Sequence, residues 1–129
     1  MTEIIQDYPP NYDKIAATFE LSGREIFAYA GKIYNPSKGR ITPELIAHEE
    51  VHFRQQGRDP DGWWELYLKN PEFRYEMELD AHRAEYRAFC AIHGDRNARA
   101  RFLQMLARRL SSPMYGKVVD FRGAMRAIK

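Results

Sequence analysis

The chain is poor in cysteine and has no long apolar run. Its 129 residues include one cysteine, Cys90, which excludes an intramolecular disulfide and a cysteine-based zinc cluster. The apolar runs are too short for a membrane span, and residues 1–14 have early acids and no apolar core of a secretory signal. We therefore expect a cytoplasmic protein that is neither secreted nor bound to a membrane.

Acidic residues are scarce in the last part of the chain, and the two signs of charge are unevenly distributed. Residues 1–95 carry 11 Lys/Arg and 17 Asp/Glu, a net charge of −6, whereas residues 96–129 carry 9 and 1, a net charge of +8. A basic segment of this kind either binds a polyanion such as nucleic acid, packs on the acidic part, or forms a solvated helix face. We favour the last two interpretations and treat nucleic-acid binding through residues 96–129 as an alternative.

The pattern of apolar residues and turn signals predicts one α+β domain over residues 1–129 that is mostly helical. Residues 25–28 and 32–34 flank Ala30-Gly31, which predicts a small β-hairpin. Start and stop signals predict helices over about residues 9–19, 43–56, 63–69, 72–92, 97–110 and 120–128. The chain is long enough for one core and too short for two.

The most informative motif is His48-Glu49-Glu50-Val51-His52, which matches H-E-x-x-H within the helix predicted over 43–56. Residues four apart lie on one helix face, so both imidazoles reach one ion. Zinc accepts two imidazoles and a carboxylate and keeps a fourth position for water. Glu49, rotated by about 100° from His48, is placed to take a proton from that water. The motif predicts His48 and His52 as zinc ligands and Glu49 as the catalytic base.

A third ligand is expected from the helix over 72–92. On a helical wheel that starts at Tyr75, Glu78 falls at about 300° and His82 at about 340°, on the apolar face. Glu76 falls at about 100°, on the polar side with the arginines. A metal-binding carboxylate must point toward the helix that carries His48, so we predict Glu78, with Glu76 as the alternative.

Other residues remain open at this stage. His82 either orients a ligand, contacts a reaction intermediate or fills the core. Trp63 and Trp64 favour the core and the surface of one short helix over a substrate platform. Arg108 and Arg109 are expected to lie outside the site. Phenol groups that could stabilise an oxyanion are those of Tyr75, Tyr86 and Tyr115.

The motif with a downstream helical Glu resembles the gluzincin metallopeptidases, the thermolysin-like clan. In that clan the third ligand is often followed three residues later by a small residue and four later by Asp or Asn. Glu78 is followed by Ala81 and His82, and Glu76 by Leu79 and Asp80, so neither matches in full. The resemblance implies a zincin-like fold whose hairpin, here residues 27–34, aligns an extended peptide by β-addition.

A closer resemblance is to small metallopeptidase-like proteins of phages and prophages. It covers most of the chain after about residue 25, and the similar stretches are 33–36, 48–56, 63–68, 73–83 and 110–116. In that group the Glu of a Glu-x-(Glu/Asp)-Ala-x-Arg segment is the ligand, which falls on Glu78. The resemblance implies a protein of the host cytoplasm or the virion, with a peptide or protein substrate and other phage proteins as partners.

Together these patterns predict a zinc metallopeptidase that hydrolyses peptide bonds with a metal-activated water. The alternatives are a non-catalytic zincin-like phage structural or interaction protein, and a nucleic-acid-binding module that uses the basic residues 96–129. Glu49 favours the enzyme, since a general base has no duty at a purely structural metal.

Overall fold

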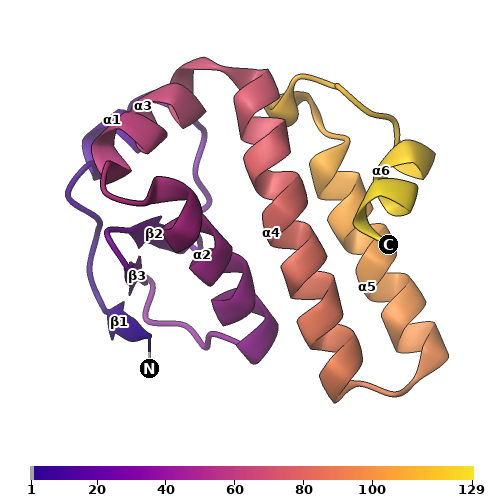
Figure 1. Ribbon diagram of the computed structural model, residues 1–129. Helices are drawn as coiled ribbons and strands as arrows, with labels where there is room; N and C mark the ends of the chain where they lie inside the picture. Colours follow the sequence, from indigo (N-terminus) through magenta and orange to yellow (C-terminus); the bar gives the residue numbers. More distant parts are fainter. Residues whose placement is uncertain (1) are drawn as a thin grey trace.

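A computed structural model describes residues 2–129 and has a mostly helical α+β fold (Figure 1). Its elements are, in order, β1 (Glu3–Ile5), α1 (Tyr12–Thr18), β2 (Phe27–Tyr29), β3 (Lys32–Tyr34), α2 (Pro43–Gln56), α3 (Pro60–Lys69), α4 (Pro71–Ile92), α5 (Arg96–Leu110), the 3-10 helix η1 (Pro113–Tyr115) and α6 (Phe121–Ile128). The coarse fold class expected from the sequence is confirmed.

Helix α4 lies in the middle of the molecule (Figure 1). On one side it packs against α2 and α3, and α2 in turn contacts β2 of the small sheet. On the other side it packs against α5, α6 and η1. None of the helices formed by residues 2–129 is both long and apolar enough to cross a membrane.

The sheet has the strand order β1-β3-β2. Strands β2 and β3 form the predicted antiparallel hairpin, and Ala30 and Gly31 both have positive φ, 51° and 79°, as a tight two-residue turn requires. Strand β1 pairs in parallel with β3 and was not predicted from the sequence. A three-residue strand paired to a distant segment leaves too weak a local pattern.

The helices begin at residues whose side chains accept a hydrogen bond from the first turn. Thr42 does so for α2 and Asn70 for α4, each followed by proline. Asp95 and Asp120 do the same for α5 and α6. Helix α3 starts three residues earlier than expected, because Asp59 accepts from the Gly62 amide and Pro60 is the first helical residue. The sequence analysis had assigned those residues to a connector.

Two apolar clusters lie on either side of the α2–α4 pair. The first joins α1, β2 and α3 through Ile15, Phe27, Trp63, Trp64 and Tyr67. The second joins α5, η1 and α6 through Leu103, Leu106, Ala107, Leu110, Tyr115, Ala124 and Ile128. Helices α5 and α6 therefore pack through apolar faces, and within residues 2–129 no Lys or Arg of the basic segment forms an ion pair.

Candidate metal centre

Helix α2 presents its two motif histidines toward α4. His48 and His52 are one turn apart, and their Nε2 atoms are 3.2 Å from each other. His52 is almost fully buried, and its ring lies against Trp63 of α3 at a centroid distance of 5.1 Å. The spacing in the motif therefore produces the converging pair that the sequence predicted.

Helix α4 supplies the carboxylate. Glu78 Oε1 lies 3.0 Å from the Nε2 atoms of both His48 and His52, and its other oxygen accepts a hydrogen bond of 2.6 Å from the Tyr67 hydroxyl. Glu76 is exposed on the opposite side of the helix. The structure thus brings together the preferred trio and leaves the alternative ligand in solvent.

The separations in this trio fit a zinc ion. Zinc bonds of about 2.0–2.1 Å in a tetrahedral site place two ligand atoms about 3.3 Å apart. The measured separations are 3.0, 3.0 and 3.2 Å. His48, His52 and Glu78 form one of the two groups of potential ligand atoms found among residues 2–129.

Hydrogen bonds at the far side of each ring determine which nitrogen carries the proton. His48 Nδ1 lies 2.8 Å from Glu85 Oε1, and His52 Nδ1 lies 2.8 Å from Gln55 Oε1. The Gln55 amide nitrogen donates to the Met77 carbonyl at 3.0 Å, so the amide oxygen faces His52. Carboxylate and amide oxygens only accept hydrogen bonds. Both Nδ1 atoms must therefore donate.

The consequence is a convergence of lone pairs. With Nδ1 protonated, neutral His48 and His52 each present an Nε2 lone pair to the other and to the Glu78 carboxylate. This arrangement is repulsive unless additional protons or a metal ion lie between the three groups. Glu85 and Gln55 were not assigned this role from the sequence, although Glu85 lies two turns after Glu78 on the same helix face.

Electrostatics agree with this requirement. Burial alone would lower the pKa of both imidazoles, but the Glu78 carboxylate outweighs burial and raises the pKa of His52, and that of His48 strongly. Burial would raise the pKa of Glu78, yet His52 and His48 hold it well below its usual range. The metal-free cluster therefore holds protons that a metal ion would displace.

Glu49 lies beside the trio rather than in it. Its carboxylate is buried and lies 3.7 Å from His48 Nε2. Burial raises its pKa, which makes it a stronger proton acceptor. The neighbouring Glu50 accepts a hydrogen bond from Thr2 and does not line the cleft described below.

His82 and Glu85 form a second buried pair on α4. Glu85 Oε1 lies 3.1 Å from His82 Nδ1 and also receives His48 Nδ1, and these contacts hold the pKa of Glu85 at about 2 despite its burial. His48, His82 and Glu85 are the other group of potential ligands, but its closest contacts are these hydrogen bonds. His82 Nε2 is buried and has no hydrogen-bond partner within residues 2–129.

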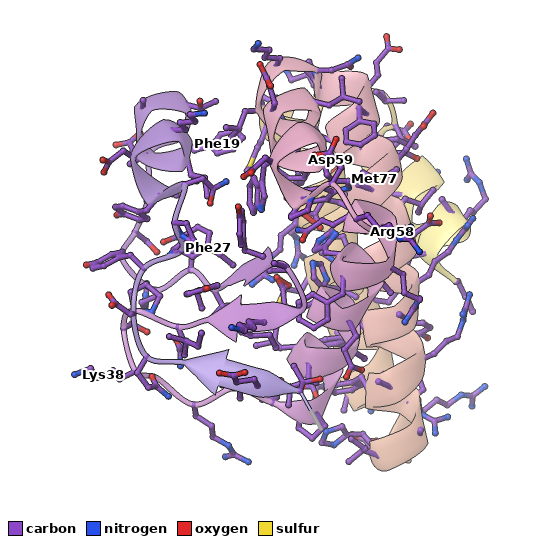
Figure 2. The ribbon with its side chains drawn as sticks, turned by 60° about the vertical axis from the view of Figure 1, so that its left-hand side comes forward. Phe19, Phe27, Lys38, Arg58, Asp59 and Met77 are labelled. Carbon is purple, nitrogen blue, oxygen red and sulfur yellow. The ribbon has the colours of Figure 1, made fainter. Side chains whose placement is uncertain are left out.

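The three histidines and three buried carboxylates line one cleft of about 1000 Å³: His48, His52, His82, Glu49, Glu78 and Glu85. Part of its lining comes from α1 and the segment that joins it to β2, with Phe19 directly after α1 and Phe27 as the first residue of β2, both labelled in Figure 2. The opposite side includes Arg109 of α5 and Tyr115 of η1. The expectation that Arg109 lies outside the site was wrong for this reason, whereas Arg108 does lie outside the cleft.

The hairpin differs in part from the expected peptide-binding edge at residues 27–34. Strand β3 is central in the sheet and has no free edge. At β2 the Ala28 carbonyl accepts from Gln56 Nε2 at 2.7 Å and Trp64 Nε1 at 2.9 Å, and the Ala30 amide donates to Gln56 Oε1. Side chains thus occupy the Ala28 carbonyl and the Ala30 amide at the outer edge of β2, and the lining residues 24–26 precede the strand.

The tryptophans also correct an expectation. Trp63 and Trp64 are both buried, so Trp64 is not a surface residue of α3. Its indole N–H is used by Ala28. The tandem tryptophans therefore attach α3 to both the histidine cluster and the sheet.

Comparison with known proteins finds no matching family model, no matching curated protein and no matching solved structure.

Proposed function

We propose that the protein is a zinc-dependent metallopeptidase of the zincin type. One observation carries the proposal: two Nε2 lone pairs and a carboxylate oxygen converge at about 3 Å in a cleft that also holds a buried free carboxylate. His48, His52 and Glu78 would hold zinc. The supporting features are the α2–α4 pair and a short sheet beside α2, as a zincin-like fold has.

Each residue then has a defined task. Zinc would supply a Lewis acid that polarises the scissile carbonyl and lowers the pKa of the attacking water toward neutrality. Glu49 accepts the proton of that water and returns it to the leaving amine. Glu85 and Gln55 orient the two imidazoles through Nδ1, and Tyr67 orients Glu78.

The substrate in this proposal is an extended peptide or protein segment. Residues 24–26 line the cleft directly before β2. A strand added there would place its carbonyl groups above the histidine cluster. Other phage proteins as partners, and a place in the host cytoplasm or the virion, belong to the same proposal.

The Glu49→Gln variant tests this function. We expect the variant to bind one zinc ion per chain and to lose about 10²–10⁴-fold in cleavage of a peptide library, because it lacks the base. Glu50→Gln is the matched control and should retain activity, since Glu50 does not line the cleft. Zinc binding by all three proteins with cleavage by none would instead support a non-catalytic scaffold.

A further inference from the structure

Three arginines line the cleft that holds the histidine cluster. They are Arg24, which precedes β2, Arg40, which precedes α2, and Arg109 near the end of α5. All three are exposed. Within residues 2–129 none of their guanidinium groups forms an ion pair or a hydrogen bond with a carboxylate. The cleft therefore has three cations without internal partners.

These cations approach the cluster from both sides. Arg24 and Arg40 belong to the segments before β2 and α2, whereas Arg109 belongs to α5, which lies on the other side of α4 from α2 and the sheet (Figure 1). The pKa of the Tyr115 phenol depends in part on the charge of Arg109. Burial and then the Glu78 charge raise the pKa of Tyr115, while Arg109 acts in the opposite direction. Arg109 is thus close enough to Tyr115 to affect its pKa, as the Glu78 carboxylate also does.

The carboxylates of the cleft neutralise this charge only in part. Glu25 is half-buried and accepts hydrogen bonds from the amides of Ser22 and Gly23 in its own loop, which keep it ionised, so it offsets one of the three positive charges. Glu49, Glu78 and Glu85 are buried around the histidines. Outside this buried cluster the cleft therefore has three arginines and one glutamate, a formal net charge of +2.

We propose that the cleft selects acidic peptides, with Asp or Glu side chains close to the scissile bond. This inference rests on the proposed peptidase function, which makes the bound peptide a substrate. The apolar residues Leu21, Ile26 and Met114 line the same cleft, which favours a peptide over a nucleic acid. Single-stranded nucleic acids bind on exposed aromatic rings. Of the aromatic residues that line this cleft, Phe19 is half-buried with the Arg74 guanidinium over its ring, and the others are buried: Phe27, Trp63, Trp64, Tyr67 and Tyr115.

Binding, rather than turnover, gives the decisive test. A fluorescein-labelled peptide with Glu on both sides of a central Phe-Leu bond is titrated with zinc-loaded and metal-free Glu49→Gln protein. Its Gln counterpart is titrated in parallel. We expect the Glu peptide to bind at least about tenfold more tightly, and the difference to shrink as salt rises. Arg24→Gln, Arg40→Gln or Arg109→Gln should each weaken Glu-peptide binding by about 2–5-fold.

Two surface cations serve as matched controls. Arg108 is the neighbour of Arg109 and lies over the Phe121 ring, and Lys38 points away from the molecule in Figure 2. Neither lines the cleft. Arg108→Gln and Lys38→Gln should leave binding of the Glu peptide unchanged.

The outcomes separate this inference from the proposed function. Equal binding of the Glu and Gln peptides would overturn the inference even if the wild type cleaves peptides. Tighter binding of a single-stranded oligonucleotide that depends on the same arginines would also overturn it. Selective, arginine-dependent binding without any cleavage by the wild type would support the acidic preference and refute the peptidase.

Discussion

At the scale of the residue, the site depends on what each imidazole does with its second nitrogen. The i, i+4 spacing predicts that His48 and His52 share a helix face, and the helical wheel predicts that Glu78 faces inward. The Nδ1 atom of His48 has a tertiary partner, Glu85, which is 37 residues away in the sequence. The Nδ1 atom of His52 has a local partner, Gln55. A sequence pattern therefore predicts which three side chains converge, while the groups that orient them can be found only from the packed helices.

Glu85→Gln tests the orienting role at this scale. The Nδ1 atoms of His48 and His82 both contact the same oxygen of Glu85, so an amide oxygen can still accept from both, but it lacks the negative charge that strengthens these hydrogen bonds. We expect zinc affinity, measured by competition with a chelating dye, to fall by about 10–100-fold. Asp80→Asn on the exposed face of the same helix is the control and should bind zinc as the wild type does. Unchanged affinity in Glu85→Gln would mean that Glu85 only fills space.

At the scale of the element, capping residues explain which helices the sequence predicted well. Thr42-Pro43 and Asn70-Pro71 define the starts of α2 and α4, the two helices that build the site. The start of α3 was misplaced because Asp59-Pro60 is followed by a turn-like Asp-Gly pair. Strand β1 was missed because its only partner, β3, lies almost thirty residues away. Local signals decide helix ends and the β2–β3 hairpin, whereas the pairing of strands far apart in the sequence is decided by the fold of the whole chain.

Gly57 is the local signal that ends α2, the helix that carries His48 and His52. It ends α2 at φ 53° and ψ −123°, a conformation that side chains with a Cβ rarely adopt. Gly57→Ala should therefore lower the free energy of unfolding by about 1–3 kcal/mol. Gly94→Ala has open space and no positive φ and should be near neutral. Chemical denaturation of both variants measures the difference, and equal stability would contradict the strain.

At the scale of the whole molecule, the α2–α4 pair lies between two separate apolar clusters. The buried groups at this junction are mostly polar, including Glu49, His52, Glu78 and Glu85. Without a metal ion they are held by shared protons and hydrogen bonds. A metal ion would therefore join the two halves of the protein directly. The position of Arg109 at the cleft is also a property of the whole molecule. It follows from the packing of α5 and not from any pattern in the basic segment.

Zinc should therefore raise the melting temperature. At a free zinc concentration of 100 times the dissociation constant, binding adds about 2.7 kcal/mol to the free energy of unfolding, or roughly 10 °C for a domain of this size. Glu78→Ala should abolish most of this increase, and Glu76→Ala should retain it, because Glu76 is exposed. Differential scanning fluorimetry with zinc and with a chelator makes the comparison. An equal increase in both variants would exclude Glu78 as a ligand.

The donor set and its orienting groups all come from residues 48–85, which form the uninterrupted series α2, α3 and α4. Closing a loop between neighbouring helices costs little chain entropy, and such local contacts form quickly during folding. During synthesis on a ribosome, all three proposed ligands are available once α4 has left the exit tunnel, before α5 and α6 have left it. Under the proposed function, a metal ion would therefore be able to bind before the basic helices cover α4 and before Arg109 reaches the cleft.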